Sequence, residues 1–118
     1  MGSLVLMAWQ ETFEAILVAL LSLSEMVYAA DIPTYVMVAQ AGRLTPNTLE
    51  VPADQQFKVL IRNKGIDDIE FGSLQLRKRK VVLAGGESSI VIASLIPGEY
   101  DFFDRFHMDS GRGHIIAR

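Results

Sequence analysis

Two glutamates inside an apolar stretch are the first residues whose types and spacing could do chemistry. Glu11 and Glu14 are three positions apart, so on a helix they project from the same face and could jointly hold one cation. Ionisable side chains inside an apolar segment are costly, and such residues are by default candidates for function. The spacing therefore predicts a carboxylate pair that faces a cation, if this segment forms a helix.

The segment around this pair has the features of a targeting or membrane helix. It runs from Leu4 to Leu23 without Gly or Pro, and its length is about that needed to cross a bilayer. Val27 and Ala29 then have the small-residue spacing of a signal-peptidase site. We expect residues 1–30 to be either a signal peptide or a membrane-anchor helix, and no Lys or Arg precedes Arg43 to decide between them. Both alternatives predict a periplasmic location, exported or anchored to the inner membrane.

The composition excludes several classes of protein. The chain has no cysteine, which excludes disulfides, thiolate zinc sites, iron–sulfur clusters, cysteine nucleophiles and the thiolate of a blue-copper centre. Its formal net charge of −3 provides no basic field of the kind that nucleic-acid binding needs. The sequence also carries no Ser-His-Asp elbow, phosphate loop or zinc signature, so a hydrolase or transferase has no support. Whether the protein is an enzyme stays open.

From Thr34 onward the hydrophobic pattern changes to that of short strands. β-Branched and aromatic runs of a few residues alternate with turn signals that contain Pro, Gly or Asn. Many short strands without a helical window predict an all-β, antiparallel sandwich or barrel, formed by a domain over residues 31–118. The runs are Tyr35–Val38, Phe57–Arg62, Val81–Leu83, Ile90–Ala93 and His114–Ile116.

Three sequence segments (phrases) of this domain resemble a known protein family. They are RLTPNTLEVPADQQFKVLIRNKG (43–65), IEFGSLQLRKRKVVLAGGESSIVI (69–92) and LIPGEYDFFDRFHMDSGRGHIIAR (95–118). The last one joins a proline-glycine turn, an aromatic strand, an acid and a histidine to a glycine-rich return strand. In this order the phrases resemble the cupredoxin-like domains encoded beside bacterial iron-uptake permeases. The resemblance implies a Greek-key β-sandwich with a metal site at one end.

The resemblance also implies a ligand set. In blue-copper cupredoxins the penultimate strand ends in an aromatic-aromatic-Cys-x-x-His arrangement, and another histidine comes from an earlier segment. Here the Cys position falls on Asp104, the following histidine on His107 and the earlier one on Glu70, while the axial Met position falls near Arg112 and Met108 is only its neighbour. Two carboxylates and an imidazole prefer iron, Cu(II) or manganese over Cu(I). A copper or iron ion is therefore the cofactor that the resemblance implies.

Further residues near this set bear on metal binding. Asp101 and Asp109 flank the same loop and could contribute oxygen ligands, although Asp101 alternates with Phe102 and so can face the other way along the strand. The resemblance also leads us to expect an acid within LRKRKVV, where this chain has Arg79. A cation at that position argues against metal binding.

The N-terminal segment carries a second resemblance. The stretch Trp9–Ala15, WQETFEA, is similar to the Arg-Glu-x-x-Glu iron-binding motif in the first membrane helix of iron permeases, with Gln10 in the place of the arginine. It implies that both halves of the chain belong to iron uptake. The alternative is an atypical signal peptide, or an anchor whose glutamates lie near the membrane surface.

Each candidate residue also has a purely structural interpretation. Glu70 could be the solvent-facing member of an alternating strand pair. Asp104 could cap backbone amides in a loop where His107 is a surface residue, and His114 is best explained as structural or exposed. The basic run Arg77–Lys80 is typical of a hairpin edge protected against aggregation. The functional interpretation of this basic run is a docking surface for an acidic partner or for anionic lipids.

Two functions remain open from the sequence. The first is a periplasmic or membrane-tethered metal-binding protein of iron uptake, which binds iron or copper through Glu70, Asp104 and His107 or assists Fe(II) oxidation at a permease. The second is a metal-free β-sandwich interaction module that docks onto a membrane transporter or periplasmic partner. The expected partners are an iron permease or another iron-uptake component, and the membrane if residues 1–30 stay uncleaved.

Overall fold

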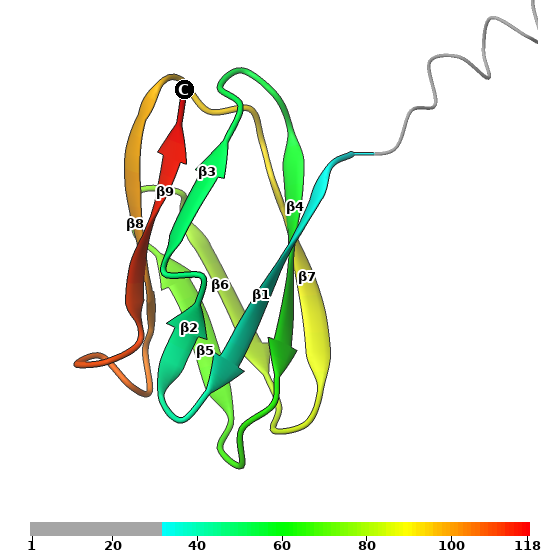
Figure 1. Ribbon diagram of the computed structural model, residues 1–118, viewed down its shortest axis with the longest axis vertical. Coiled ribbons are helices and arrows are strands. Elements are labelled where there is room, and N and C mark those ends of the chain that lie inside the picture. Colours follow the sequence, from blue (N-terminus) through cyan, green and yellow to red (C-terminus); the bar gives the residue numbers. More distant parts are fainter. Residues whose placement is uncertain (1–31) are drawn as a thin grey trace, which may run out of the picture. The chain divides into compact units, whose positions relative to one another are not determined.

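The computed structural model describes residues 32–118, which form two β-sheets packed face to face (Figure 1). One sheet contains β1 (Thr34–Gln40), β2 (Arg43–Thr45), β4 (Phe57–Asn63) and β7 (Glu87–Ile92), in the order β2-β1-β4-β7. The other contains β3 (Thr48–Val51), β5 (Ile69–Ser73), β6 (Lys78–Val82), β8 (Gly98–Asp104) and β9 (Arg112–Ala117), in the order β3-β9-β8-β5-β6. The predicted all-β sandwich is confirmed for these residues.

The strand pairing differs from the expectation in one respect. Most pairs are antiparallel, but β1 pairs with β4 and β3 with β9 in parallel. Parallel neighbours need a long connection. The chain provides one by passing from β2 in the first sheet to β3 in the second and back to β4, which leaves β4 running in the same direction as β1 (Figure 1).

The core forms where the inward residues of the two sheets meet. In β4 the alternate residues Phe57, Val59 and Ile61 are each at most 1% exposed, as expected for one face of a strand. Phe71 of β5 and Phe102 of β8 are equally buried, and their rings stack with centroids 5.5 Å apart. Burying one such ring contributes roughly 1.5–3 kcal/mol, so these aromatic side chains fix how β5 and β8 lie against the other sheet.

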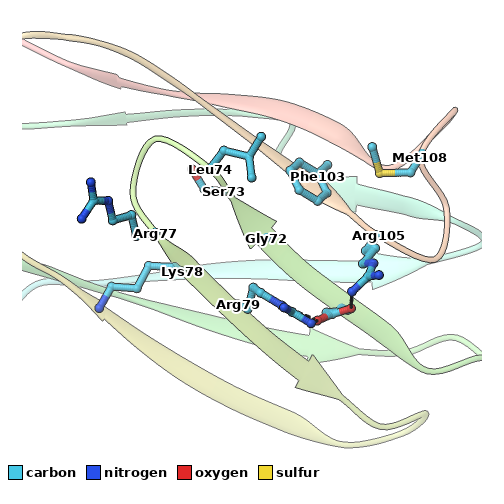
Figure 2. Close-up of a pocket in the computed structure, with 10 residues that line it drawn as sticks. Gly72, Ser73, Leu74, Arg77, Lys78, Arg79, Phe103, Arg105 and Met108 are labelled. Atoms are coloured by element: carbon cyan, nitrogen blue, oxygen red, sulfur yellow. Dashed lines mark hydrogen bonds and ion pairs between the residues drawn. The ribbon is translucent and has the colours of Figure 1, made fainter.

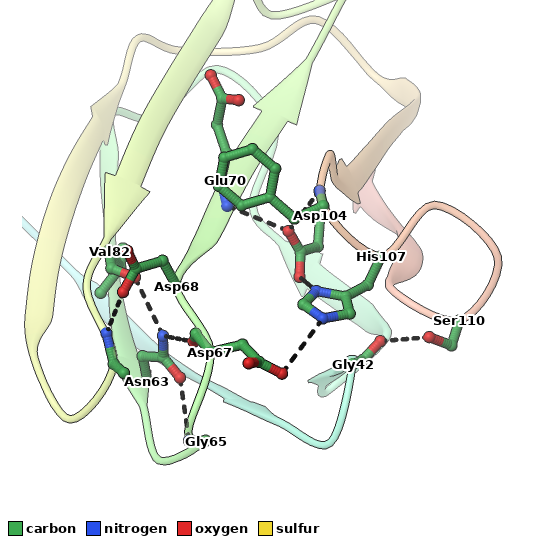
Figure 3. Close-up of polar contacts among 12 residues, drawn as sticks. Gly42, Asn63, Gly65, Asp67, Asp68, Glu70, Val82, Asp104, His107 and Ser110 are labelled. Atoms are coloured by element: carbon green, nitrogen blue, oxygen red, sulfur yellow. Dashed lines mark hydrogen bonds and ion pairs between the residues drawn. The ribbon is translucent and has the colours of Figure 1, made fainter.

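The predictions for residues 1–30 lie outside the described part of the chain. These are the signal peptide or membrane-anchor helix and the pair Glu11 and Glu14. Within residues 32–118 the chain has no helix long and apolar enough to span a membrane. Two regions of the sandwich carry the candidate functional residues: the outer face of β5, β6 and β8 (Figure 2) and the end where β8 leaves the sheet (Figure 3).

One glycine makes the close packing of β9 possible. A Cβ atom on Gly113 would overlap the carbonyl oxygen of Asn47 and the ring of Phe102, whereas a Cβ on Gly98 would come no closer than 3.7 Å to Tyr100. Gly113→Ala should therefore lower the free energy of unfolding by about 1–3 kcal/mol through overpacking, measured by urea denaturation. Gly98→Ala is the matched control and should change it by less than about 0.5 kcal/mol. Equal effects of the two substitutions would contradict this packing.

Candidate functional site

Asp104 is the centre of a hydrogen-bond network at the end of β8 (Figure 3). Its side chain is 1% exposed. Oδ1 accepts hydrogen bonds from the backbone N–H groups of Glu70 and Phe106, both at 3.1 Å, and Oδ2 lies 2.6 Å from Nδ1 of His107. An ionised carboxylate only accepts, so the proton of the last bond belongs to the imidazole. Both oxygens of Asp104 are therefore engaged by the protein itself.

The loop that follows Asp104 is closed by its own backbone. Asp104 N–H donates to the carbonyl of Gly111 at 2.6 Å, and Gly111 N–H donates to the carbonyl of His107 at 2.8 Å. The hydroxyl of Ser110 donates to the carbonyl of Gly42 in the β1–β2 turn at 2.6 Å. A Cβ at position 111 would lie 2.7 Å from the Cβ of Asp104, so this close approach requires glycine. The glycine-rich return segment thus holds His107 against Asp104.

The second ring nitrogen of His107 faces a residue that the sequence did not indicate. Nε2 lies 3.9 Å from Oδ2 of Asp67 in the β4–β5 loop (Figure 3). The side chains of His107 and Asp67 are 25% and 72% exposed. Asn63 positions this loop, because its buried amide donates to the carbonyls of Asp67 at 2.8 Å and of Val82 at 3.0 Å. The only signal in the sequence was an acidic pair, Asp67 and Asp68, just before β5.

Glu70 lies on the opposite face of the sheet from Asp104. Phe71 is the partner of Asp104 in the antiparallel pairing of β5 with β8, and directly opposed residues share a face. Successive residues of a strand alternate, so Glu70 must point outward, away from the core. The register therefore separates its carboxylate from Asp104 and His107, although its backbone N–H bonds to Asp104.

Two arginines cover the outward carboxylate of Glu70. Nε and Nη2 of Arg79 both lie 2.8 Å from Oε1, and Nη1 of Arg105 lies 3.6 Å from Oε2. The Glu70 side chain is 7% exposed as a result. The structural interpretation of a solvent-facing glutamate is thus wrong, because the guanidinium groups shield it from water.

The remaining predicted residues are placed apart from Asp104 and His107. Asp101 faces outward, and its Oδ1 lies 2.8 Å from Nδ1 of His114, its partner residue on β9. Asp109 is exposed in the loop. Within residues 32–118, no group of three or more His, Asp or Glu side chains is arranged to hold a metal ion. The structure brings together Asp104 and His107 but neither Glu70 nor Asp101 with them.

Comparison with known proteins identifies related chains. Residues 13–117 match the family model of the cupredoxin-like domain. The uncharacterized protein RP394 of Rickettsia prowazekii (strain Madrid E) is 35% identical over 75 residues, which are 64% of this chain and 60% of RP394. This chain therefore matches less than two thirds of that relative's length.

Solved structures are similar in fold. Auracyanin A of Chloroflexus aurantiacus, described as a "blue" copper protein, has a TM-score of 0.64 and 8% identity over 75% of this chain and 100% of its own. The dithionite-reduced auracyanin of Roseiflexus castenholzii has a TM-score of 0.61 and 14% identity over 75% of this chain and 99% of its own. At such identities the likeness concerns the fold alone.

The donor set here does not fit a blue-copper centre. Such a centre uses a cysteine thiolate, two histidines and a weak axial thioether. The chain has no cysteine, and Asp104, at the position that the resemblance assigns to it, uses both oxygens in bonds to the protein. Only Nε2 of His107 is not hydrogen-bonded to Asp104, and it faces Asp67. Met108 borders a groove on the outer face of the second sheet. The thiolate chemistry of a blue-copper centre therefore does not carry over to this site.

The hydrogen-bond network predicts that Asp104 is a stability determinant. Asp104→Ala would leave the buried N–H of Glu70 without its acceptor, which costs about 1–3 kcal/mol. It would also remove two part-buried hydrogen bonds to a charged group, from Phe106 and His107, each worth about 1.5–3 kcal/mol. We expect a loss of about 3 kcal/mol or more in urea denaturation. Asp101→Ala removes an exposed pair from the same strand and should cost at most about 1 kcal/mol. A loss at Asp104 no larger than that at Asp101 would refute the network.

Proposed function

The chain belongs to the cupredoxin-like family, and on that premise we propose that its domain is an interaction module of an iron-uptake system. It docks onto a membrane transporter such as an iron permease, or onto another periplasmic component, and does not carry electrons through copper. The observation that supports this best is how the three expected ligands are used. Asp104 and His107 are bonded to each other, and Glu70 is held by Arg79 and Arg105.

The charge balance at Glu70 favours a metal-free domain. A buried carboxylate is costly unless a cation compensates for it. Here the fork of Arg79 provides that cation, and a guanidinium stays charged at any physiological pH. Arg79 stands where the family resemblance leads us to expect an acid. An ion at Glu70 would have to displace this arginine and overcome the repulsion of Arg105.

The link to iron uptake rests on sequence resemblance. The three phrases between Arg43 and Arg118 resemble domains encoded beside iron permeases, and Trp9–Ala15 resembles a permease motif. The location, exported to the periplasm or anchored to the inner membrane, follows from residues 1–30 acting as a signal peptide or anchor. Assisting Fe(II) oxidation is the less supported role, because it needs a redox centre or an electron acceptor beyond these residues.

One observation favours metal binding as a second candidate function. Histidines that bind metals usually donate their other ring N–H to a carboxylate, which orients the ring. His107 does so to Asp104, and its Nε2 faces Asp67 at a place open to solvent. An imidazole and a carboxylate suit Cu(II) or iron. Asp67 and His107 would then hold the ion, with Asp104 as the positioning residue.

Metal titration of His107→Asn separates the two candidates. The asparagine amide can still donate to Asp104, but Nε2 is removed. We titrate the full chain and the variant with Cu(II), Fe(II) and Fe(III) by calorimetry. The interaction module predicts no stoichiometric binding by either protein. One equivalent bound by the natural chain and lost in both His107→Asn and Asp67→Asn would instead establish the second candidate.

Growth under iron limitation tests the role itself. In the source organism, deletion of the gene should slow growth on limiting iron, and the natural chain should restore it. Because docking does not need Nε2, His107→Asn should restore growth equally well, with the protein level checked by immunoblot. Normal growth of the deletion strain would exclude a role in iron uptake. Failure of His107→Asn at a normal protein level would exclude a function independent of the imidazole.

A further inference from the structure

A groove of about 840 Å³ lies on the outer face of the five-stranded sheet, over β5, β6 and β8 (Figure 2). Its floor is built from two adjacent outward residues, one small and one flat, on β5 and β8. The ring of Phe103 lies on Gly72, its partner residue on β5, and a Cβ at Gly72 would come within 2.9 Å of that ring. The glycine therefore makes the floor of the groove, and the floor is apolar.

One side of the groove is apolar and unusually open to solvent. Leu74 is 84% exposed and Met108 is 38% exposed, and they lie on either side of Phe103 (Figure 2). These side chains come from the β5–β6 turn, β8 and the loop after β8. Exposed apolar side chains that gather in a hollow indicate a binding surface more often than single ones do.

The other side of the groove is basic. Arg77, Lys78, Arg79 and Arg105 line it (Figure 2). Among the lining residues within 32–118, Glu70 is the single acid. Four cations against one carboxylate leave an excess of three positive charges, in a chain whose formal net charge is −3. Both oxygens of Glu70 are already in ion pairs with Arg79 and Arg105, so these cations compensate its repulsion of an incoming carboxylate.

Arg77 lies in the β5–β6 turn with a left-handed backbone conformation. Its φ is +54°, a left-handed conformation that costs a residue with a Cβ about 1 kcal/mol and that Gly or Asn adopts more easily. The turn alone would favour one of those residues. Ala41 and Asp54 adopt the same region elsewhere in the described residues, so this conformation alone does not indicate a use for the side chain. What matters for binding is that the side chain of Arg77 is exposed at the groove.

Building on the proposed function, we propose that this groove binds an acidic segment of the partner protein. The segment places an apolar side chain against Leu74, Phe103 and Met108, and its carboxylates against the basic side. A protein segment fits these observations better than a membrane surface, because the exposed apolar residues line a groove of about 840 Å³ beside the cations, which has room for side chains. The partner's segment is thus expected to alternate Asp or Glu with a large apolar residue.

The test measures binding of a defined peptide to the full chain. The probe is a fluorescein-labelled peptide of sequence EDLEDFED, followed by fluorescence anisotropy at low and at physiological salt. The double variant Arg77→Gly and Lys78→Gln removes two cations but keeps Arg79 on Glu70, and its turn is less strained. It should weaken binding roughly tenfold at low salt, since each exposed charge pair contributes modestly, and leave the unfolding midpoint equal or higher.

Two controls make the result specific. Arg43→Gln with Lys64→Gln removes two exposed cations that do not line the groove, and it should leave the affinity unchanged. A peptide with Gly in place of Leu and Phe should bind more weakly to the natural chain. Equal loss in both double variants would reduce the effect to net charge and overturn the proposal. Absence of peptide binding, or binding only to phosphatidylglycerol vesicles and not to phosphatidylcholine vesicles, would overturn it too.

The experiments distinguish failure of the groove proposal from failure of the proposed function. If the groove does not bind an acidic segment but the domain is an interaction module, the peptide does not bind, while His107→Asn still supports growth on limiting iron and binds no metal. If the interaction module is wrong, deletion does not affect that growth, or the natural chain binds a metal ion that His107→Asn does not. The peptide result alone therefore decides the groove.

Discussion

The pairing of β5 with β8 is the constraint on which the candidate site depends. It sets Phe71 opposite Asp104, and both side chains point into the sandwich. Because side chains alternate along a strand, Glu70 is then sent to the outer face. A shift of one residue would exchange the faces, but it would also expose Phe71 to solvent, and the buried aromatic pair makes that register unfavourable. Core packing thus separates the carboxylates that the family pattern would combine.

Each of the two separated carboxylates has its own binding partners in the protein. Asp104 is satisfied by two backbone N–H groups and an imidazole, and Glu70 by two guanidinium groups. No buried side-chain N or O within residues 32–118 lacks a hydrogen-bond partner. A site prepared for a metal ion would instead present carboxylate oxygens to one common point. In this cupredoxin-like domain, the charges of Glu70 and Asp104 are thus compensated by the protein itself.

The sequence predicted the sandwich because most core strands alternate clearly, as β4 does. The burial of β5 was harder to predict, because Glu70 and Gly72 look like the solvent-facing residues of a strand. Both are buried under Arg79 and Phe103, which come from other strands. The family pattern placed Asp104 and His107 together as expected ligands of one metal ion, but it did not predict the hydrogen bond between them. The approach of Asp67 could not be predicted, because it depends on how Asn63 folds a distant loop. The proximity of residues within one strand and the loop that follows it could be predicted from the sequence, whereas contacts between strands depend on the strand register.

Diffraction at the copper absorption edge, from crystals of the full chain grown with Cu(II), tests the central claim most directly. The strand register predicts that no anomalous peak lies within bonding distance of Glu70 together with Asp104 or His107, and that Arg79 stays on Glu70. A copper ion shared by Glu70 and either of those residues would contradict it.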